Sequence, residues 1–350
     1  MSKNISTPLL NESAKRTRYD WLDNIKAFAM AFVVFAHLGL NGCSPFVLYS
    51  SFIKLPLFFA ASGFVFNPKK SDDFKTFIVT RAKRIIVPYL LLSLILRLFE
   101  IFRYNGDILK WIKDTAVSIG TGTIMWFLPT LFICNVLMYL VFKLSHNKDA
   151  FVIISAIISF ILGYFLISDK HIIMGANTAF IAYPMCIFGY YFKETILIIE
   201  KKYQAIICVI CSIIFIGLPL LYKYKNGSLN YINMFESKYC SYFYDMLIAY
   251  AGVLAFFIAF QFIKFPSFVT WFGKNTIFYY AFHVPACKLI LFVLSITISP
   301  AFTSQNLRGS VKGTIAYFGI TIVTLILLSP ICTLVNKKLP FIVGLRKSKK

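Results

Sequence analysis

The sequence predicts an all-α fold, a polytopic membrane helical bundle of about ten transmembrane helices. Of its 350 residues, 59% are hydrophobic and only 14% are charged, whereas soluble domains carry about a quarter charged residues. Apolar windows of about 20 residues, the length that a helix needs to cross the hydrocarbon core of a bilayer, recur along the whole chain. Together these observations exclude an ordinary soluble enzyme.

The predicted spans follow one another with short connections, and neither internal repeats nor broken helices at matching positions are evident. No Pro-, Gly- and Ser-rich linker divides residues 1–350, so we expect one integral membrane domain. A polar cytoplasmic tail is expected at 1–20 and a basic one at 335–350. The spans are expected at 24–42, 46–66, 85–102, 122–142, 151–168, 177–192 (short, and a candidate re-entrant segment), 203–222, 241–263, 275–297 and 313–334.

The basic residues predict the orientation of these spans. Lys and Arg number 36, and the formal net charge is +22. Taking alternate connections together, 23 of the basic residues lie on the side that holds both termini and 9 on the other side. The positive-inside rule therefore places both termini in the cytoplasm. Because the charges lie between apolar runs and not in one stripe, membrane lipids are expected partners and nucleic acid is not.

Six ionisable residues fall at a similar depth in the outer half of predicted spans: His37, Lys54, Arg97, Glu100, His283 and Lys288. An ionisable side chain at such a depth is costly unless it faces a cavity or a partner, so these are functional candidates. We predict that His37 is the chemical centre, with Lys54 and Arg97 as catalytic partners. The alternatives are that His37 is a core histidine bonded to a carbonyl, that Arg97 and Glu100 only bond one another, and that Lys288 extends to the surface.

A basic connection precedes the third span and contains Arg81 and Arg84. Three residues apart on a helix, they share one face, and paired guanidinium groups suit phosphate oxygens such as those of a CoA thioester. The alternative is that they only contact lipid headgroups. Asp23 lies 14 residues before His37, about 21 Å away along a straight helix. It therefore cannot orient the His37 ring, and we expect it near the arginines, or as a simple helix N-terminal charge.

Other chemistry has little support in the sequence. No nucleotide-binding Gly-rich loop, nucleophile elbow or HExxH motif is present. The eight cysteines lie mostly inside apolar runs and are interpreted as small buried hydrophobes, so no metal is expected. Trp126, near the outer start of the fourth span, suits an aromatic belt at the membrane interface.

Five segments in order resemble the acyltransferase-3 family of integral membrane acyltransferases, in particular its fucose 4-O-acetylase-like polysaccharide O-acetyltransferase branch. The matching segments are Trp21-Leu-Asp-Asn-Ile-Lys…His37, Leu55-Pro-Leu-Phe-Phe-Ala-Ala-Ser-Gly63-Phe, Arg81-Ala-Lys-Arg84-Ile-Ile-Val-Pro88-Tyr, Trp126-Phe-Leu and Gly273-Lys-Asn-Thr-Ile-Phe-Tyr-Tyr-Ala-Phe-His283.

The resemblance implies transfer of an acyl group, commonly acetyl, from cytoplasmic acyl-CoA to a sugar hydroxyl beyond a bacterial inner membrane. By position, His37 matches the essential histidine of the family, and Arg81 and Arg84 match its RxxR pair near the CoA. Lys54 stands where many relatives of this branch carry histidine. The expected partners are acetyl-CoA, or another acyl-CoA, and a glycan or lipid-linked sugar acceptor.

We therefore expect His37 to act as a general base or to carry the acyl group briefly, with Lys54 or Arg97 stabilising the oxyanion. Arg81, Arg84 and Asp23 are expected at the CoA, and Trp126 and His283 at the acceptor. The leading alternative is a transporter or flippase for lipid-linked sugars, which would also need a charged central cavity. A glycan polymerase is a third possibility.

Overall fold

The computed structural model describes residues 18–38, 45–70, 73–167, 173–227, 232–302 and 311–345. All regular secondary structure in these ranges is helical, as the sequence predicts. The α-helices are α1 (Asp20–His37), α2 (Pro45–Ile53), α3 (Pro56–Phe64), α4 (Phe74–Leu98), α5 (Ile108–Thr121), α6 (Phe127–Leu144), α7 (Asp149–Phe165), α8 (Ala176–Thr195), α9 (Lys201–Asn226), α10 (Tyr242–Phe262), α11 (Ser267–Lys274), α12 (Thr276–Thr297) and α13 (Val311–Lys338). Short 3-10 turns are η1 (Pro68–Lys70), η2 (Ile101–Tyr104), η3 (Ile173–Gly175), η4 (Ile196–Ile198), η5 (Pro300–Phe302) and η6 (Pro340–Val343).

Seven helical segments of the described ranges are long and apolar enough to cross a membrane, so the prediction of a polytopic helical bundle is confirmed. The other three predicted spans coincide with α1 and α4, which carry several charges, and with α7, which has 17 residues. The count of ten and the side of the termini therefore stay predictions. The seven are Phe46–Phe64, Phe127–Leu144, Ile173–Ile198, Lys201–Asn226, Tyr242–Phe262, Thr276–Thr297 and Lys312–Lys338.

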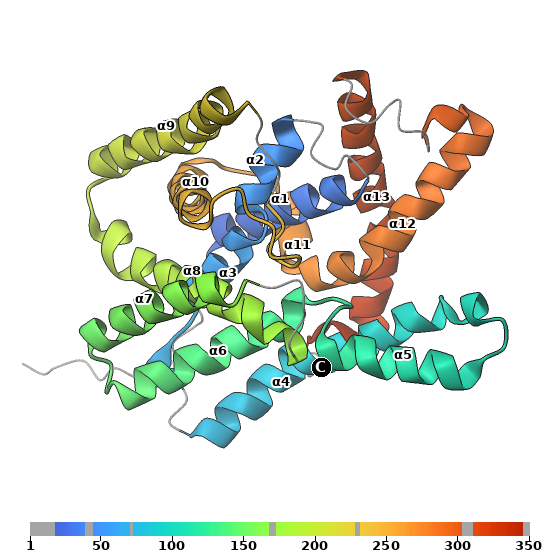
Figure 1. Ribbon diagram of the computed structural model, residues 1–350, viewed down its shortest axis with the longest axis horizontal. Coiled ribbons are helices and arrows are strands. Elements are labelled where there is room, and N and C mark those ends of the chain that lie inside the picture. Colours follow the sequence, from blue (N-terminus) through green and yellow to red (C-terminus); the bar gives the residue numbers. More distant parts are fainter. Residues whose placement is uncertain are drawn as a thin grey trace, which may run out of the picture.

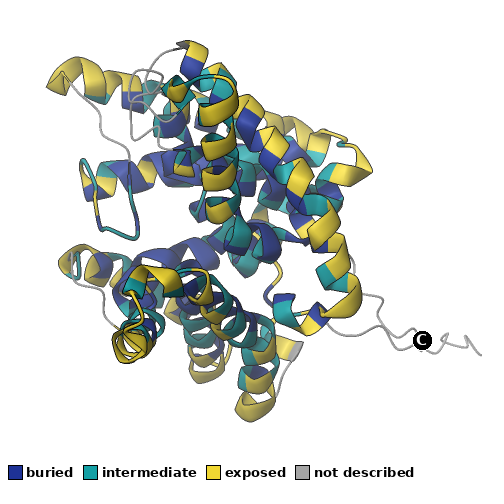
Figure 2. Cartoon of the chain, turned by 90° about the vertical axis from the view of Figure 1, so that its right-hand side faces the viewer, coloured by how far each residue is buried: buried dark blue, intermediate teal, exposed yellow. Residues whose placement is uncertain are grey.

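The outer surface of this bundle is apolar, which fits a lipid environment. In α9 only 11% of the apolar window is buried within the protein, and side chains such as Val209 and Ile213 are exposed. Figure 2 shows buried residues gathered inside the bundle and exposed residues around its periphery. Such a large apolar surface would be a liability in water, so the helices that carry it face lipid.

The second predicted span is not continuous. α2 ends at Ile53 and α3 begins at Pro56, with Lys54 and Leu55 in the turn between them. Pro56 has no N–H to donate to the preceding helical turn, which explains the interruption. The predicted span over 46–66 is therefore present, as Phe46–Phe64, but it is built from two helices with a break at Lys54 and Leu55. Irregular backbone at membrane depth is tolerated where it is buried in protein or lines a cavity.

Glycines allow α3 to pack directly against α8 at the centre of the bundle. A Cβ added at Gly63 would overlap the backbone of Cys186, and a Cβ at Gly189 would overlap the backbone of Ala60. Small residues of this kind let two membrane helices approach until their backbones touch. In Figure 1, α1 and α3 lie near the middle of the molecule, with α4, α6 and α7 on one side of them and α12 and α13 on another.

Two segments expected as connections are helical, and the predicted basic tail begins inside a helix. α5 occupies most of the expected outer connection at 103–121, and α11 lies in the expected inner connection at 264–274. α13 continues to Lys338, after which η6 packs against α4. The first 17 residues of the predicted N-terminal tail, and 346–350 of the C-terminal one, lie outside the described residues.

Candidate active site

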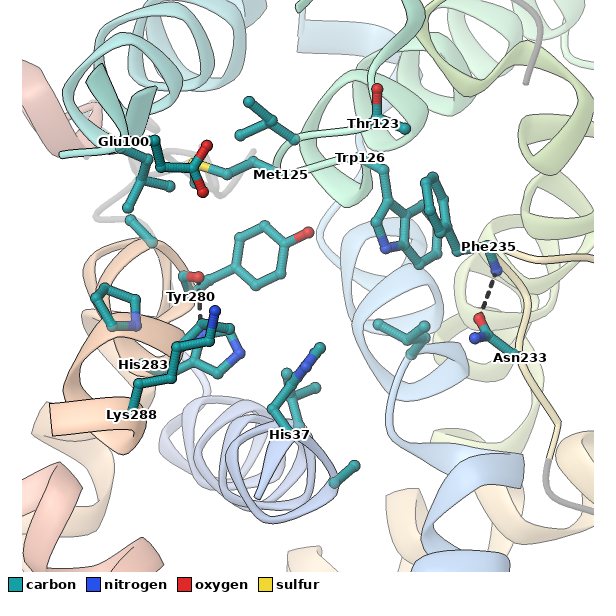
Figure 3. A pocket seen from close by; sticks show the side chains of 18 of the residues that line it. His37, Glu100, Thr123, Met125, Trp126, Asn233, Phe235, Tyr280, His283 and Lys288 are labelled. Carbon is teal, nitrogen blue, oxygen red and sulfur yellow. Dashed lines mark hydrogen bonds between the residues drawn. The ribbon is translucent and has the colours of Figure 1, made fainter. Parts of the chain in front are cut away.

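A cavity of about 760 Å³ opens between the helices at the C-terminal end of α1. Its wall comes from α1, the α2–α3 break, the end of α4, the residues before α6, the segment before α10, and α12 (Figure 3). All six residues of the predicted ionisable layer line it, together with Trp126: His37, Lys54, Arg97, Glu100, His283 and Lys288. The structure thus brings together residues from four separate predicted spans and the start of another.

His37 and His283 lie side by side in this cavity. The ring centroids are 4.9 Å apart, with the planes inclined at 63°. His37 is exposed to the cavity, so it is not the core histidine of the alternative interpretation. His283 is buried, and its Nδ1 lies 2.9 Å from the carbonyl oxygen of Tyr280 and 3.1 Å from that of Tyr279.

These contacts fix the chemical state of the His283 ring. A ring nitrogen within hydrogen-bond distance of two carbonyl oxygens must carry the proton and donate it. In neutral His283, Nε2 therefore holds a lone pair, and within the described residues this buried atom has no hydrogen-bond partner. The ring thus presents one free proton acceptor beside His37.

Arg97 is already engaged by its neighbours. It donates to the Glu100 carboxylate at 2.6 Å, the Thr115 hydroxyl at 3.2 Å and the Tyr104 hydroxyl at 2.5 Å. Thr115 belongs to α5, which explains why this segment is held against the end of α4. With each guanidinium nitrogen in a hydrogen bond, Arg97 fits best as the residue that holds Glu100 in the cavity wall.

Lys54 occupies the break between α2 and α3, and its backbone N–H still donates to the carbonyl of Ser50 at 2.9 Å. Its side chain lines the cavity that holds His37. Among the described residues, no carboxylate lies within ion-pair distance of its ammonium group. Lys54 is therefore the predicted catalytic partner whose charge remains available.

Trp126 forms an aromatic wall with Phe235, a residue that sequence reasoning missed. The two rings stack with centroids 5.3 Å apart and planes inclined at 25°. Phe235 and Glu236 sit in a tight turn in which the Asn233 side-chain oxygen accepts hydrogen bonds from both of their backbone N–H groups. This turn places Asn233, Phe235 and Glu236 in the cavity lining.

A second, smaller pocket of about 190 Å³ adjoins the first. The two share the wall residues Val33, Leu55 and Tyr280. Its lining is mostly apolar, and it extends along α1 to Lys26 and along α4 to Ile85. Lys26 lies eleven residues before His37, about 16 Å along the helix axis. The pocket therefore extends from a wall that it shares with the histidine cavity toward the opposite end of α1.

The predicted arginine pair lies beside this second pocket but lines neither of the two. The Arg81 guanidinium lies over the Phe77 ring, 5.4 Å from its centroid. Ile85, the neighbour of Arg84, lines the second pocket. Both arginines are half-buried in the first half of α4, and their role stays a prediction.

Asp23 does not line either pocket, but it holds a residue that does. Its buried carboxylate accepts from Arg18 at 2.8 Å and from Lys26 at 2.6 Å. A Cβ at Gly273 would overlap the backbone carbonyl of Asp23, so only glycine allows α11 to approach α1 this closely. Asp23 thus joins two of the sequence motifs and fixes Lys26, which sequence reasoning also missed, at the second pocket.

A comparison of the sequence with models of known protein families shows which family the chain belongs to. The model of the acyltransferase-3 family, an acyltransferase domain, matches residues 19–333. The chain belongs to this family, and it is a multi-pass membrane acyltransferase. No curated protein and no solved structure matched the chain.

Proposed function

We propose that the chain is an O-acyltransferase that moves an acetyl group, or another acyl group, from cytoplasmic acyl-CoA to a hydroxyl of a cell-surface or lipid-linked polysaccharide. The observation that carries this proposal is the position of His37, which lines one cavity while a second pocket lies against that cavity and extends toward the opposite end of α1. Two substrates can therefore approach one imidazole from two directions. The proposed setting is the inner membrane of a bacterium.

The donor would enter from the end of α1 that carries Lys26. Phosphate groups of CoA suit the cations there, namely Lys26, Arg81 and Arg84, because each can donate charge-assisted hydrogen bonds. The mostly apolar second pocket suits the pantetheine arm. An opening in the shared wall at Leu55 and Tyr280 would bring the thioester to the histidine cavity. Acetyl-CoA is the donor we expect.

In direct transfer, His37 accepts the proton of the acceptor hydroxyl while the hydroxyl oxygen attacks the thioester carbonyl carbon. A C–O bond forms and the C–S bond breaks. The CoA thiolate leaves and takes the proton from the His37 imidazolium, which restores the neutral ring. Lys54, whose ammonium has no ion-pair partner among the described residues, would stabilise the oxyanion of the tetrahedral intermediate.

In a relay, His37 itself attacks the thioester, and the acyl group waits on its nitrogen until the acceptor hydroxyl displaces it. The two routes differ in one observable species. Purified protein mixed with isotopically labelled acyl-CoA, in the absence of acceptor, should carry the label on His37 only if the relay operates. Peptide mass spectrometry of the quenched protein reads this out, and a label that leaves on addition of acceptor establishes that the intermediate is competent.

The acceptor would occupy the wider cavity. The stacked Trp126 and Phe235 rings offer an apolar wall of the kind that packs against the C–H face of a sugar ring. His283 Nε2 is positioned to accept a hydrogen bond either from His37 or from the acceptor hydroxyl. The positions of Trp126 and His283 in this cavity support the prediction that both residues contact the acceptor sugar.

A transporter of lipid-linked sugars remains the competing function, because transporters also use a broken helix at a central site and the α2–α3 break is one. Membership of an acyltransferase family favours the enzyme. The deciding experiment uses purified protein in sealed vesicles with a lipid-linked glycan, with and without acyl-CoA. We expect acylated glycan only when acyl-CoA is present and His37 is intact. Movement of unmodified glycan across the bilayer without acyl-CoA would overturn the enzymatic proposal.

A further inference from the structure

The histidine cavity carries a surplus of positive charge. Four basic side chains line it, and only two carboxylates do so, those of Glu100 and Glu236. The four cations are Lys54, Arg97, Arg103 and Lys288. Charges that lack counter-charges at membrane depth are costly, and Lys288, which is exposed where it lines the cavity, is accessible to an anionic partner.

Both carboxylates already form ion pairs with other cations. Glu100 is held between Arg97 at 2.6 Å and Arg103 at 3.6 Å. Glu236 pairs with Lys238 at 2.6 Å. Neither is left to neutralise Lys54 or Lys288, and no other carboxylate of the described residues lies within ion-pair distance of these two ammonium groups.

Lys288 lies farther along α12 than the reaction centre. It follows His283 by five residues, about 7.5 Å along the helix axis, in the direction away from the second pocket. Lys54, by contrast, occupies the helix break and is assigned to the oxyanion. Lys288 is thus the cation that remains on the acceptor side of the cavity.

We infer that the acceptor is an acidic sugar, and that Lys288 binds its anionic group while the hydroxyl to be acylated lies at His37. The ammonium would bind a carboxylate or a phosphate, since both present anionic oxygens at similar spacing. The Trp126–Phe235 wall would contact the apolar face of the same sugar. This inference rests on the proposed function for the identity of the acceptor site, but binding can be measured without turnover.

The test measures binding to purified full-length protein in nanodiscs by equilibrium dialysis. The probes are methyl glucoside, methyl glucuronide (the same sugar with one carboxylate) and a phosphate monoester of methyl glucoside. We expect the acidic sugars to bind about tenfold more tightly than the neutral one, because a charge-assisted hydrogen bond contributes at least that much. The difference should shrink as salt is raised. Whichever acidic probe binds more tightly identifies carboxylate or phosphate as the group that is recognised.

Three variants make the test specific. Lys288→Gln should abolish the preference for acidic sugars, and Lys288→Arg should keep it, which separates loss of charge from misfolding. Lys223→Gln removes a lysine from the exposed end of α9, away from the cavity, and should leave the preference unchanged. The inference is overturned if the wild type binds acidic and neutral sugars with equal affinity, or if it binds neither. An equal loss in the Lys223 variant also overturns it.

The outcome is separable from that of the proposed function. Tight binding of acidic sugars through Lys288, without acyl transfer to any of them, would support the subsite and contradict the enzymatic proposal. Acyl transfer to the acidic sugars at an undiminished rate in Lys288→Gln would do the reverse.

Discussion

Replacing His37 by Gln and His283 by Asn, singly and together, tests whether the two rings act as one proton-transfer unit. The substitutions are chosen from the geometry. Asn at 283 can keep a donor near the position of Nδ1, which bonds the carbonyls of Tyr279 and Tyr280, while it removes the lone pair at Nε2. Gln at 37 keeps a polar group of similar reach but cannot accept a proton near neutral pH.

The expected magnitude follows from the contact between the rings. General acid–base catalysis contributes about 10²- to 10⁴-fold, so each single variant should lose about that much in kcat, roughly 3 to 5 kcal/mol of transition-state stabilisation. If the two rings, whose centroids are 4.9 Å apart, transfer the proton together, removal of either ring interrupts the same step. The kcat of the double variant should therefore lie within about threefold of the kcat of the less active single variant, as is found for residues that act as a unit.

The assay is acyl transfer from labelled acyl-CoA to glycan acceptor in nanodiscs, followed by mass spectrometry, with thermal melts to establish folding. His146→Gln is the matched control, because His146 is exposed beyond the end of α6. Losses that multiply in the double variant would show that the rings act independently. A His37→Gln enzyme that keeps most of its activity would refute the assignment of His37 as the base.

Three further variants test the rest of the site and the fold. Arg84→Ala should raise the KM for acyl-CoA about tenfold or more, while Lys83→Ala, the exposed neighbour, should not; steady-state kinetics over a range of acyl-CoA concentrations distinguishes them. Trp126→Ala should raise the KM for the glycan and leave that for acyl-CoA unchanged, and an equal rise in both would contradict an acceptor role. Gly63→Ala should lower stability by about 1 to 3 kcal/mol because its Cβ overlaps the backbone of α8; Gly217→Ala, which faces open space, should not lower the melting temperature.

The cavity lining could be predicted largely from one physical rule. Ionisable side chains within apolar spans are costly, so those present should gather around a common cavity, and His37, Lys54, His283 and Lys288 do so. The rule gives depth in the membrane but not direction around each helix. The contact between the two histidine rings therefore needed the structure, as did the hydrogen bonds that occupy Arg97.

The residues that the sequence did not indicate belong to connections. Phe235 and Glu236 reach the cavity because Asn233 holds their turn and because the Asp245 carboxylate accepts the backbone N–H groups of Cys240 and Ser241. No hydrophobic period marks such a segment. Its position is decided by side-chain to backbone hydrogen bonds whose partners only the fold reveals.

Two other differences between the predicted and the observed helices had local signals in the sequence, but these signals were too weak to decide the helix boundaries. Pro56 signals the break after α2, but proline is tolerated within membrane helices, so its presence alone does not end one. α5 begins after Asp107, which accepts from the N–H of Lys110, and ends at Gly122 with a positive φ of 78°. Both are ordinary helix boundary residues, yet a helix of 14 residues is too short to register as a span.

Tyr280 connects the two halves of the proposed reaction. Its side chain is part of the wall common to both pockets, and its hydroxyl accepts from the backbone N–H of Phe127 at 3.3 Å. Its backbone carbonyl accepts from His283 Nδ1 and so sets which nitrogen of that ring is free. A shift of α12 at this residue would change the wall between the pockets and the orientation of His283 at the same time. Under the proposed function, access of the thioester and readiness of the proton acceptor would therefore both depend on one position of the chain.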